Sequence, residues 1–179
     1  MPLSPTNSPS PAAPGGLVGP EQFVFLADMI PQLVWITDHT GFHTYFNQRW
    51  TDFTGYTLAD SLGPDMWNNL LHPDDRARAR AVWGQSLASG EPYSIEYRFK
   101  ATDGSYRWVL AQALPRRSVS QTANTPIIAW FGTCTDIHEQ RQLREQLETA
   151  YADLEAKVMF RTLDLEREVL ALRRQLEAK

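Results

Sequence analysis

The chain has 179 residues, a formal net charge of −4 and a hydrophobic fraction of 42%, which is enough for one domain with a buried core and an appendage. The absence of a basic block argues against nucleic acid as the main partner, and a single cysteine excludes an internal disulfide framework and fits a reducing compartment. No apolar run approaches the roughly 20 residues of a membrane span, and the first residues lack the basic and apolar regions of a signal peptide, so we expect a cytoplasmic protein with no membrane partner.

The chain opens with a stretch rich in Pro, Ser, Ala and Gly. Residues 1–19 show no periodicity, which predicts a disordered arm. The apolar residues that follow recur at helical spacing: Phe23, Leu26, Ala27 and Ile30. They predict an amphipathic helix over residues 20–31 that Pro31 ends. Its apolar face is expected to pack on the outside of a sheet or against a second copy of itself.

A domain over residues 32–138 is expected next, and it begins with a hairpin. Residues 33–37 and 42–46 have the composition of strands on either side of a turn that ends at Gly41. His39 and His43 flank this turn, and we expect both to be solvated.

Three helices are expected in the middle of the chain. Asn47 is placed to cap a short helix over residues 48–54. Thr57 and Asp60 have the spacing of a capping box for a second short helix, ended by Gly63-Pro64. The motif His72-Pro73-Asp74-Asp75 begins a longer helix that runs to about Ser89. We expect this helix to bury Ala77, Ala81, Val82 or Trp83, and Leu87.

The pattern then changes to the alternation of strands. Apolar Tyr93, Ile95, Tyr97 and Phe99 alternate with polar residues. Asp103-Gly104 is a hairpin signal, followed by strands over residues 106–114 and 127–135. The sequence therefore predicts an α+β fold: one antiparallel five-stranded sheet with short helices on one face, followed by a long C-terminal helix. The first strand is expected to pair with the last.

These motifs, in this order, resemble the PAS family, in particular its subgroup with a His-Pro-Asp signature, as found N-terminal to bacterial sensor histidine kinases. The matching pieces cover roughly residues 21–138: Trp35–Asp38, Phe46–Tyr56, Trp67–Arg76, Glu96–Arg98, Asp103–Trp108 and Gly132–Ile137. The resemblance implies an input module with a small-molecule or cofactor pocket between sheet and helices, coupled to an output helix. The family usually ends in Asp-Ile-Thr, and here His138 replaces the Thr.

The aromatic residues of the expected inner face are candidates to line such a pocket. The candidates are Trp35, Phe46, Trp50, Phe53, Trp67, Trp83, Tyr97, Phe99, Trp130 and the non-aromatic Cys134. They fit a pocket for a small apolar or aromatic ligand, or a plain aromatic core. Both interpretations stay open here, and we expect no tightly held cofactor.

The sequence motifs give little support for a bound cofactor or for catalysis. The flavin-binding light sensors of the family need an Asn-Cys-Arg-Phe motif that this chain lacks, and haem-binding members use a histidine on the long middle helix, where residues 73–90 have none. The four histidines are too scattered for a metal site. No phosphate-binding loop or nucleophile elbow is present, so we expect no catalytic residue, although a flavin- or haem-bearing sensor remains an alternative.

Residues 139–179 contain no Gly or Pro and predict one long helix. Asp136, Ile137 and His138 form the junction with the last strand, and an Asp136 oxygen can accept a hydrogen bond from an unpaired helical N–H. An apolar seam recurs every three or four residues, about 3.67 on average: Leu143, Leu147, Tyr151, Leu154, Val158, Leu165, Val169, Leu172 and Leu176. Arg161 interrupts it.

The seam predicts a parallel coiled coil between two copies, because burying each Leu contributes roughly 1.5–3 kcal/mol. We therefore expect a homodimeric input module that passes a pocket or redox state through the junction to a downstream output such as a histidine kinase. The alternatives are a flavin or haem sensor and an adaptor that uses the fold for protein contacts alone.

Overall fold

The structure, a computed structural model, describes residues 19–61, 69–118 and 125–178. The expected N-terminal arm, the Gly63-Pro64 helix stop and Trp67 lie outside the described residues. Within them, a five-stranded antiparallel sheet has the order β2-β1-β5-β4-β3. Its strands are β1 (Leu33–Asp38), β2 (His43–Phe46), β3 (Tyr93–Lys100), β4 (Tyr106–Arg117) and β5 (Ile127–Asp136).

The central strands place the first and last parts of the domain side by side. Strand β1 pairs with β5 from Leu33–Cys134 to Asp38–Ala129, and β5 pairs in turn with β4. The expected pairing of the first and last strands is therefore confirmed. Because β5 lies at the centre of the sheet, any element attached to its end is attached to the most extensively hydrogen-bonded part of the fold.

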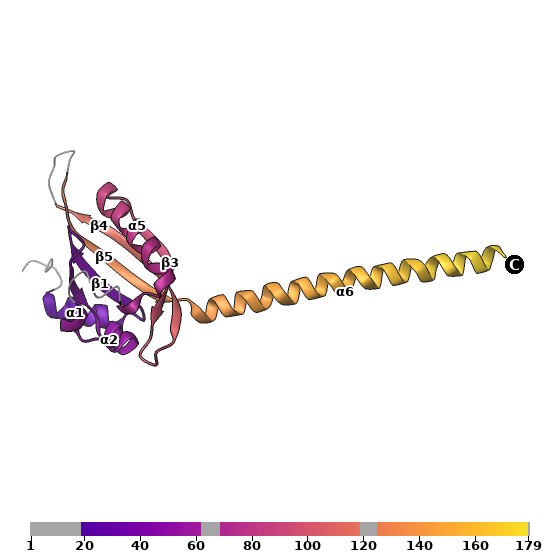
Figure 1. Cartoon of the computed structure of the whole chain (residues 1–179), viewed down its shortest axis with the longest axis horizontal. Helices are drawn as coiled ribbons and strands as arrows, with labels where there is room; N and C mark the ends of the chain where they lie inside the picture. Colours follow the sequence, from indigo (N-terminus) through magenta and orange to yellow (C-terminus); the bar gives the residue numbers. More distant parts are fainter. Residues whose placement is uncertain (1–18, 62–68, 119–124, 179) are drawn as a thin grey trace, which may run out of the picture.

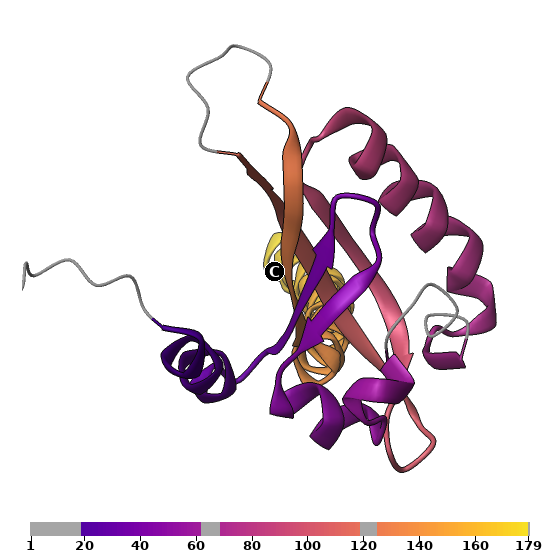
Figure 2. The ribbon, with the colours of Figure 1, turned by 90° about the vertical axis from the view of Figure 1, so that its left-hand side faces the viewer.

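Helices cover one face of this sheet (Figure 2). They are α2 (Gln48–Thr54), α3 (Leu58–Ser61) and α5 (Pro73–Ser89), while α1 (Pro20–Met29) lies beside the sheet. The local signals explain their ends. Asn47 accepts a hydrogen bond from Trp50 N–H, and Gly55 and Gly90 end α2 and α5 with positive φ. The Thr57 and Asp60 side chains cap α3 reciprocally.

Helix α5 packs only in part through the expected face: Val82, Trp83 and Leu87 pack against the core, but the two alanines do not. Ala77 and Ala81 are exposed, whereas Asp75, Ala79 and Ser86 are buried. The phase is set by Asp75, because its carboxylate accepts hydrogen bonds from Arg98 on β3 and so turns inward. Ala77 and Ala81, each two residues from a buried position, consequently face solvent.

The expectation of a solvated His43 is also wrong, because its side chain is 1% exposed. Strand β2 begins at His43, and its pairing with β1 shifts register between Ile36 and Thr37. This irregularity brings both His43 and Phe46 inward, although a regular strand would place them on opposite faces. Their rings stack at 5.2 Å.

Helix α1 is attached to the domain through Asn47 and Asp28. The Asn47 side chain donates to the carbonyls of Ala27 and Gln32, and Asp28 accepts from Gln48 N–H at the start of α2. Ala27 is buried, but Leu26 and Ile30, which were expected on the packed face, are 51% and 41% exposed. Only part of the apolar face of α1 is therefore buried against the domain.

The long helix α6 (His138–Glu177) leaves the domain as a single extended arm (Figure 1). At about 1.5 Å per residue it is roughly 60 Å long. None of its residues is buried. No helix in the described part of the chain has the length and apolar character needed to cross a membrane.

Candidate ligand pocket and strand-to-helix junction

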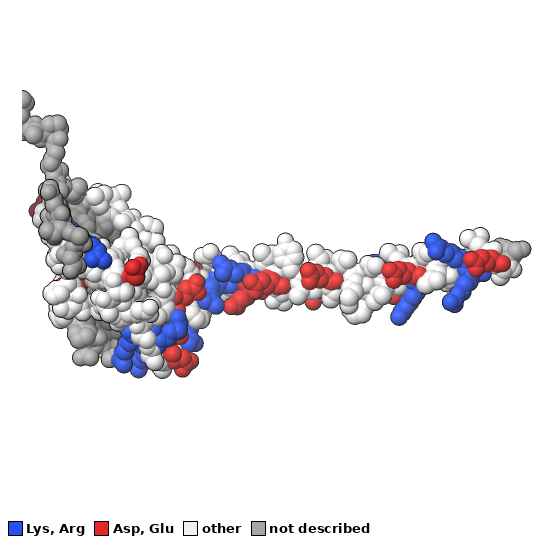
Figure 3. All heavy atoms as spheres, turned by 90° about the horizontal axis from the view of Figure 1, so that it is seen from above, with Lys and Arg blue, Asp and Glu red and all other residues white. Residues whose placement is uncertain are grey.

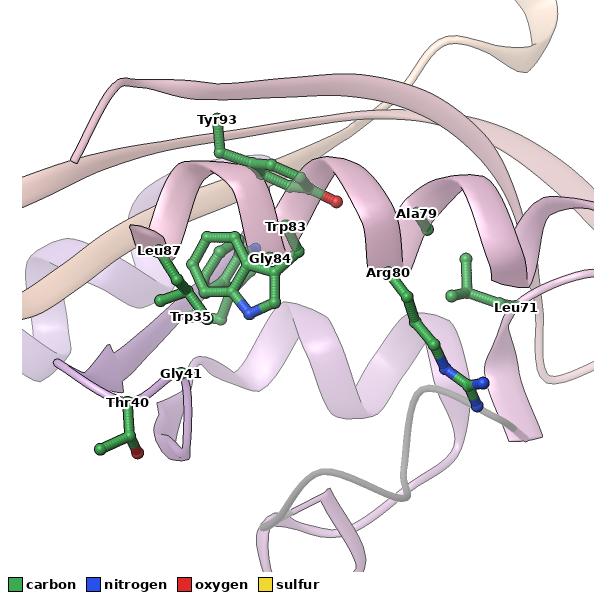
Figure 4. Close-up of a pocket in the computed structure, with 10 residues that line it drawn as sticks. All are labelled: Trp35, Thr40, Gly41, Leu71, Ala79, Arg80, Trp83, Gly84, Leu87 and Tyr93. Atoms are coloured by element: carbon green, nitrogen blue, oxygen red, sulfur yellow. The ribbon is translucent and has the colours of Figure 1, made fainter. Parts of the chain in front are cut away.

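A pocket of about 300 Å³ lies between α5 and the turn that joins β1 to β2 (Figure 4). Its lining is mostly apolar, with Thr40 at one end and Arg80 at the other. The described lining residues are Trp35, Thr40, Gly41, Leu71, Ala79, Arg80, Trp83, Gly84, Leu87 and Tyr93. A volume at the lower end of the usual range for ligand sites suits a small molecule.

Small residues on facing elements leave this space open. A Cβ atom at Gly84 on α5 would find no heavy atom within 4 Å. Gly41, with a φ of +90°, brings the turn so close that a Cβ there would lie 3.0 Å from both Leu87 Cδ1 and Trp83 Nε1. Only glycine adopts this conformation readily. The pocket is therefore open beside Gly84 and tightly packed beside Gly41.

Aromatic rings form the wall of the pocket that faces the sheet. Trp83 makes edge contacts with Trp35, Tyr93 and Trp130 at centroid distances of 5.6, 4.9 and 5.3 Å. The Trp35 ring lies across Gly132 on the neighbouring strand β5, where any Cβ would overlap its six-membered ring. Gly132 thus makes room for the indole that forms the pocket floor.

The structure distributes the sequence-derived candidates between pocket and core. Trp35 and Trp83 line the pocket, and Trp35 also belongs to the buried core. The others in the described residues belong to or pack against the core: Phe46, Trp50, Phe53, Tyr97, Phe99, Trp130 and Cys134. The sequence prediction selected large aromatic residues and missed Tyr93 and the smaller lining residues. The small residues Ala79 and Gly84, one turn before Trp83 and directly after it, were the sequence feature that could have indicated open space.

Polar groups in the core are held in their neutral forms. Burial raises the pKa of Cys134 to about 12, and its Sγ lies 3.8 Å from the Tyr97 hydroxyl. Burial also lowers the pKa of His43 to about 4, against the opposing charge of Asp38. A fully buried thiol that stays protonated is a small apolar residue in its chemistry. Among the described residues, no group of three His, Cys, Asp or Glu side chains could hold a metal ion.

The junction between β5 and α6 is a single residue, Ile137, which is 7% exposed. Its N–H donates to the carbonyl of Trp108 on β4 (2.9 Å). Asp136 Oδ1 accepts from the N–H of His138 (2.9 Å), the hydrogen bond that its position in the sequence indicates. Asp136 Oδ2 also accepts from Arg107 Nε (2.6 Å). Strand and helix are therefore joined without a flexible linker.

The seam of α6 lies on the surface of this chain. Its apolar residues are 45–75% exposed, from Leu165 to Leu176. Charged residues of both signs lie along the visible face of the arm, separated by uncharged surface (Figure 3). The coiled coil stays a prediction, since a single chain is present.

A family model described as "PAS fold" matches residues 43–123. Together with the strand order 2-1-5-4-3 and the helices on one face, this match decides the fold family. The chain contains a PAS domain. Solved structures agree: a PAS domain from Colwellia psychrerythraea has a TM-score of 0.54 at 20% identity, covering 66% of this chain and 97% of that one. An RNA-binding Light-Oxygen-Voltage receptor has a TM-score of 0.64 at 20% identity, covering 84% and 42%.

Curated relatives of this PAS domain are much longer proteins. An uncharacterized protein, y4lL, of Sinorhizobium fredii is 34% identical over 73% of this chain and 15% of its own length. The peroxide stress-activated histidine kinase mak1 of Schizosaccharomyces pombe is 31% identical over 76% of this chain and 8% of its own length. The aerotaxis receptor of Escherichia coli is 33% identical over 44% and 15%. The chain thus spans less than a sixth of each of these relatives.

Proposed function

We propose that this PAS domain is the sensory input and dimerisation module of a signal-transduction protein. Occupancy of the pocket beside α5 alters the sheet, and β5 passes the change to α6 and on to an output such as a histidine kinase. The observation that carries the proposal is the direct connection of the central strand to a 40-residue helix through the buried Ile137. Similarity to a histidine kinase and to an aerotaxis receptor supports a sensing role.

The proposed ligand is a small apolar or aromatic molecule, because the pocket walls are indole, phenol and aliphatic groups with few polar atoms. No enzymatic activity, tightly held flavin or haem is part of the proposal. Helix α5 carries no histidine that could serve as a haem ligand, and Cys134 is buried outside the pocket lining. The cytoplasmic location expected from the sequence belongs to the same proposal.

Ligand binding is tested by native mass spectrometry and thermal unfolding of the full chain against a panel of small aromatic compounds. The Gly84→Leu variant fills open space in the pocket and should abolish the ligand-dependent rise in Tm. The matched control is Ala88→Leu, at an exposed position of α5 outside the pocket lining, which should keep that rise. A purified protein with the visible absorbance of flavin or haem would overturn the ligand assignment.

Dimerisation is tested by light scattering on the full chain. Lysine at the seam positions Leu154 and Leu165 should convert a dimer to a monomer, because two charged pairs replace two apolar layers. The matched control places lysine at Leu163 and Leu170, which are equally exposed but lie off the seam. A monomeric unsubstituted chain, or equal masses for both variants, would reject the seam.

A further inference from the structure

Two arginines from different parts of the fold lie over the ring of Trp108, on the outer face of β4. The guanidinium carbon of Arg141 on α6 lies 4.1 Å from its centroid, and that of Arg98 on β3 lies 5.3 Å away. Both are within the range of cation–π attraction. Each arginine also has a carboxylate partner: Arg141 Nη1 is 2.6 Å from Glu96 Oε2, and Arg98 Nε is 2.9 Å from Asp75 Oδ2.

The sheet register explains why these groups meet. Arg98 and Trp108 are direct cross-strand partners, and Glu96 projects to the same side of β3 two residues away. Arg141 closes the first turn of α6, because its N–H donates to the carbonyl of Ile137 (2.9 Å). Its side chain is therefore anchored to two strands at the point where the helix leaves the domain.

The other arginine connects the same ring to α5. Asp75, in the first turn of α5, accepts from Arg98 through the backbone N–H and through Nε, each at 2.9 Å. Burial opposes ionisation of Asp75, but the hydrogen bonds and charge of Arg98 outweigh it and lower the pKa of this carboxyl. The next turns of the helix carry Ala79, Trp83 and Gly84 of the pocket.

We propose that Arg141 is a positioning residue that sets the angle at which α6 leaves the sheet, and that Asp75, Arg98 and Trp108 connect this angle to α5. A movement of α5 shifts Arg98 relative to the Trp108 ring and so changes the cation–π contact between this ring and Arg141. The positioning role stands on geometry alone, whereas the connection to α5 rests on the proposed sensing function.

Hydrogen exchange of the full chain tests the positioning role. Arg141→Ala removes one cation–π contact and one ion pair, so the amides of residues 141–146 should exchange about tenfold faster while β3 and β4 keep their protection. Arg144→Ala is the matched control, an exposed arginine less than one turn further along α6. Arg141→Lys, which keeps the charge but not the planar stack, should give an intermediate rate. Equal exchange in the Arg141→Ala and Arg144→Ala variants would overturn the proposal.

The connection to α5 is tested with Gly84→Leu as the pocket-filling probe. It should change the exchange of residues 141–146 by about fivefold, the scale of a modest coupling between sites, and Trp108→Leu should remove that response. A response that persists in the Trp108→Leu background would overturn the Trp108 connection while leaving the sensing function intact. No response in either background would overturn the sensing function, whereas the result with Arg141→Ala would still stand.

Discussion

The PAS domain and helix α6 differ in where their stability comes from. In the domain, the side chains of Trp35, Trp50, Tyr97 and Trp130 are at most 1% exposed and belong to one core cluster within a single chain. In α6, no residue is buried over 40 positions. Helical stability in proteins comes mainly from the packing of an apolar face, so the domain folds on contacts of its own, and the seam of α6 requires contacts from outside the chain.

This difference concentrates the coupling between the two regions in the first turn of α6. Ile137, His138 and Arg141 all contact Trp108 on the sheet. Substitutions in the domain should therefore change its unfolding strongly, and substitutions beyond this turn should not. All six tryptophans precede α6 in the sequence, so their fluorescence reports the unfolding of the domain alone.

The largest loss is expected from Gly132→Ala. The added Cβ would overlap the ring of Trp35, which is 1% exposed, so the free energy of unfolding should fall by about 3 kcal/mol. Denaturant unfolding followed by tryptophan fluorescence measures it. Gly84→Ala is the control, because its Cβ meets nothing and alanine in a helix should add about 0.5–1 kcal/mol. A stable Gly132→Ala variant would show that the Trp35 ring is not fixed.

Asn47→Ala should lower the free energy of unfolding by about 2–3 kcal/mol, because it removes four hydrogen bonds of a buried side chain. Asn47 Oδ1 accepts from Val34 and Trp50, and Nδ2 donates to Ala27 and Gln32. Chemical denaturation provides the value. Gln48→Ala, at the exposed neighbouring position, should change it by less than about 0.5 kcal/mol, and a similar result for both would contradict the role of Asn47.

Acidification should destabilise the domain through His43. Its pKa is about 4 in the fold and about 6.5 when unfolded, so the unfolded state binds more protons between these values. Stability from this residue is complete above about pH 6.5 and is lost as the pH falls, by about 2 kcal/mol between about pH 7 and pH 5. Denaturant midpoints across this range should follow this slope, and His43→Phe should flatten it. His39→Gln, at an exposed histidine of the same turn, should keep the original slope.

The smallest effect is expected in the arm. Lysine at Leu154 and Leu165, which are 56% and 45% exposed, should change the tryptophan-monitored unfolding of the domain by less than about 0.5 kcal/mol. The same variant is expected to lose the dimer, so the two regions would respond separately. A large drop in domain stability would show that the fold itself depends on the pairing of α6.

Much of the fold could be predicted because its signals are local. The cap at Asn47, the turn at Asp103-Gly104 and the alternation of β3 each depend on a few neighbouring residues. The facing of His43 could not be predicted, because it follows from a register shift against β1. The phase of α5 likewise depends on Arg98, which is 23 residues from Asp75 in the sequence.

The site was less accessible to sequence reasoning than the fold. Aromatic residues indicate either a core or a pocket wall, and only packing separates Trp83, which lines the pocket, from Trp50, which is fully buried. The open space depends on Ala79 and Gly84, residues that are small and carry no chemical signature. The link from Arg141 to Trp108 joins residues more than 30 positions apart, and no motif marks it.

The uninterrupted course of α6 has a consequence for the rotational phase of its far end. Each residue advances the helix by about 100°, so inserting one residue after Arg141 would turn everything beyond it by roughly that angle. Inserting eleven residues, about three full turns, would restore the original orientation and the seam together. The residue count of α6 thus fixes the direction in which any attached domain faces the sheet.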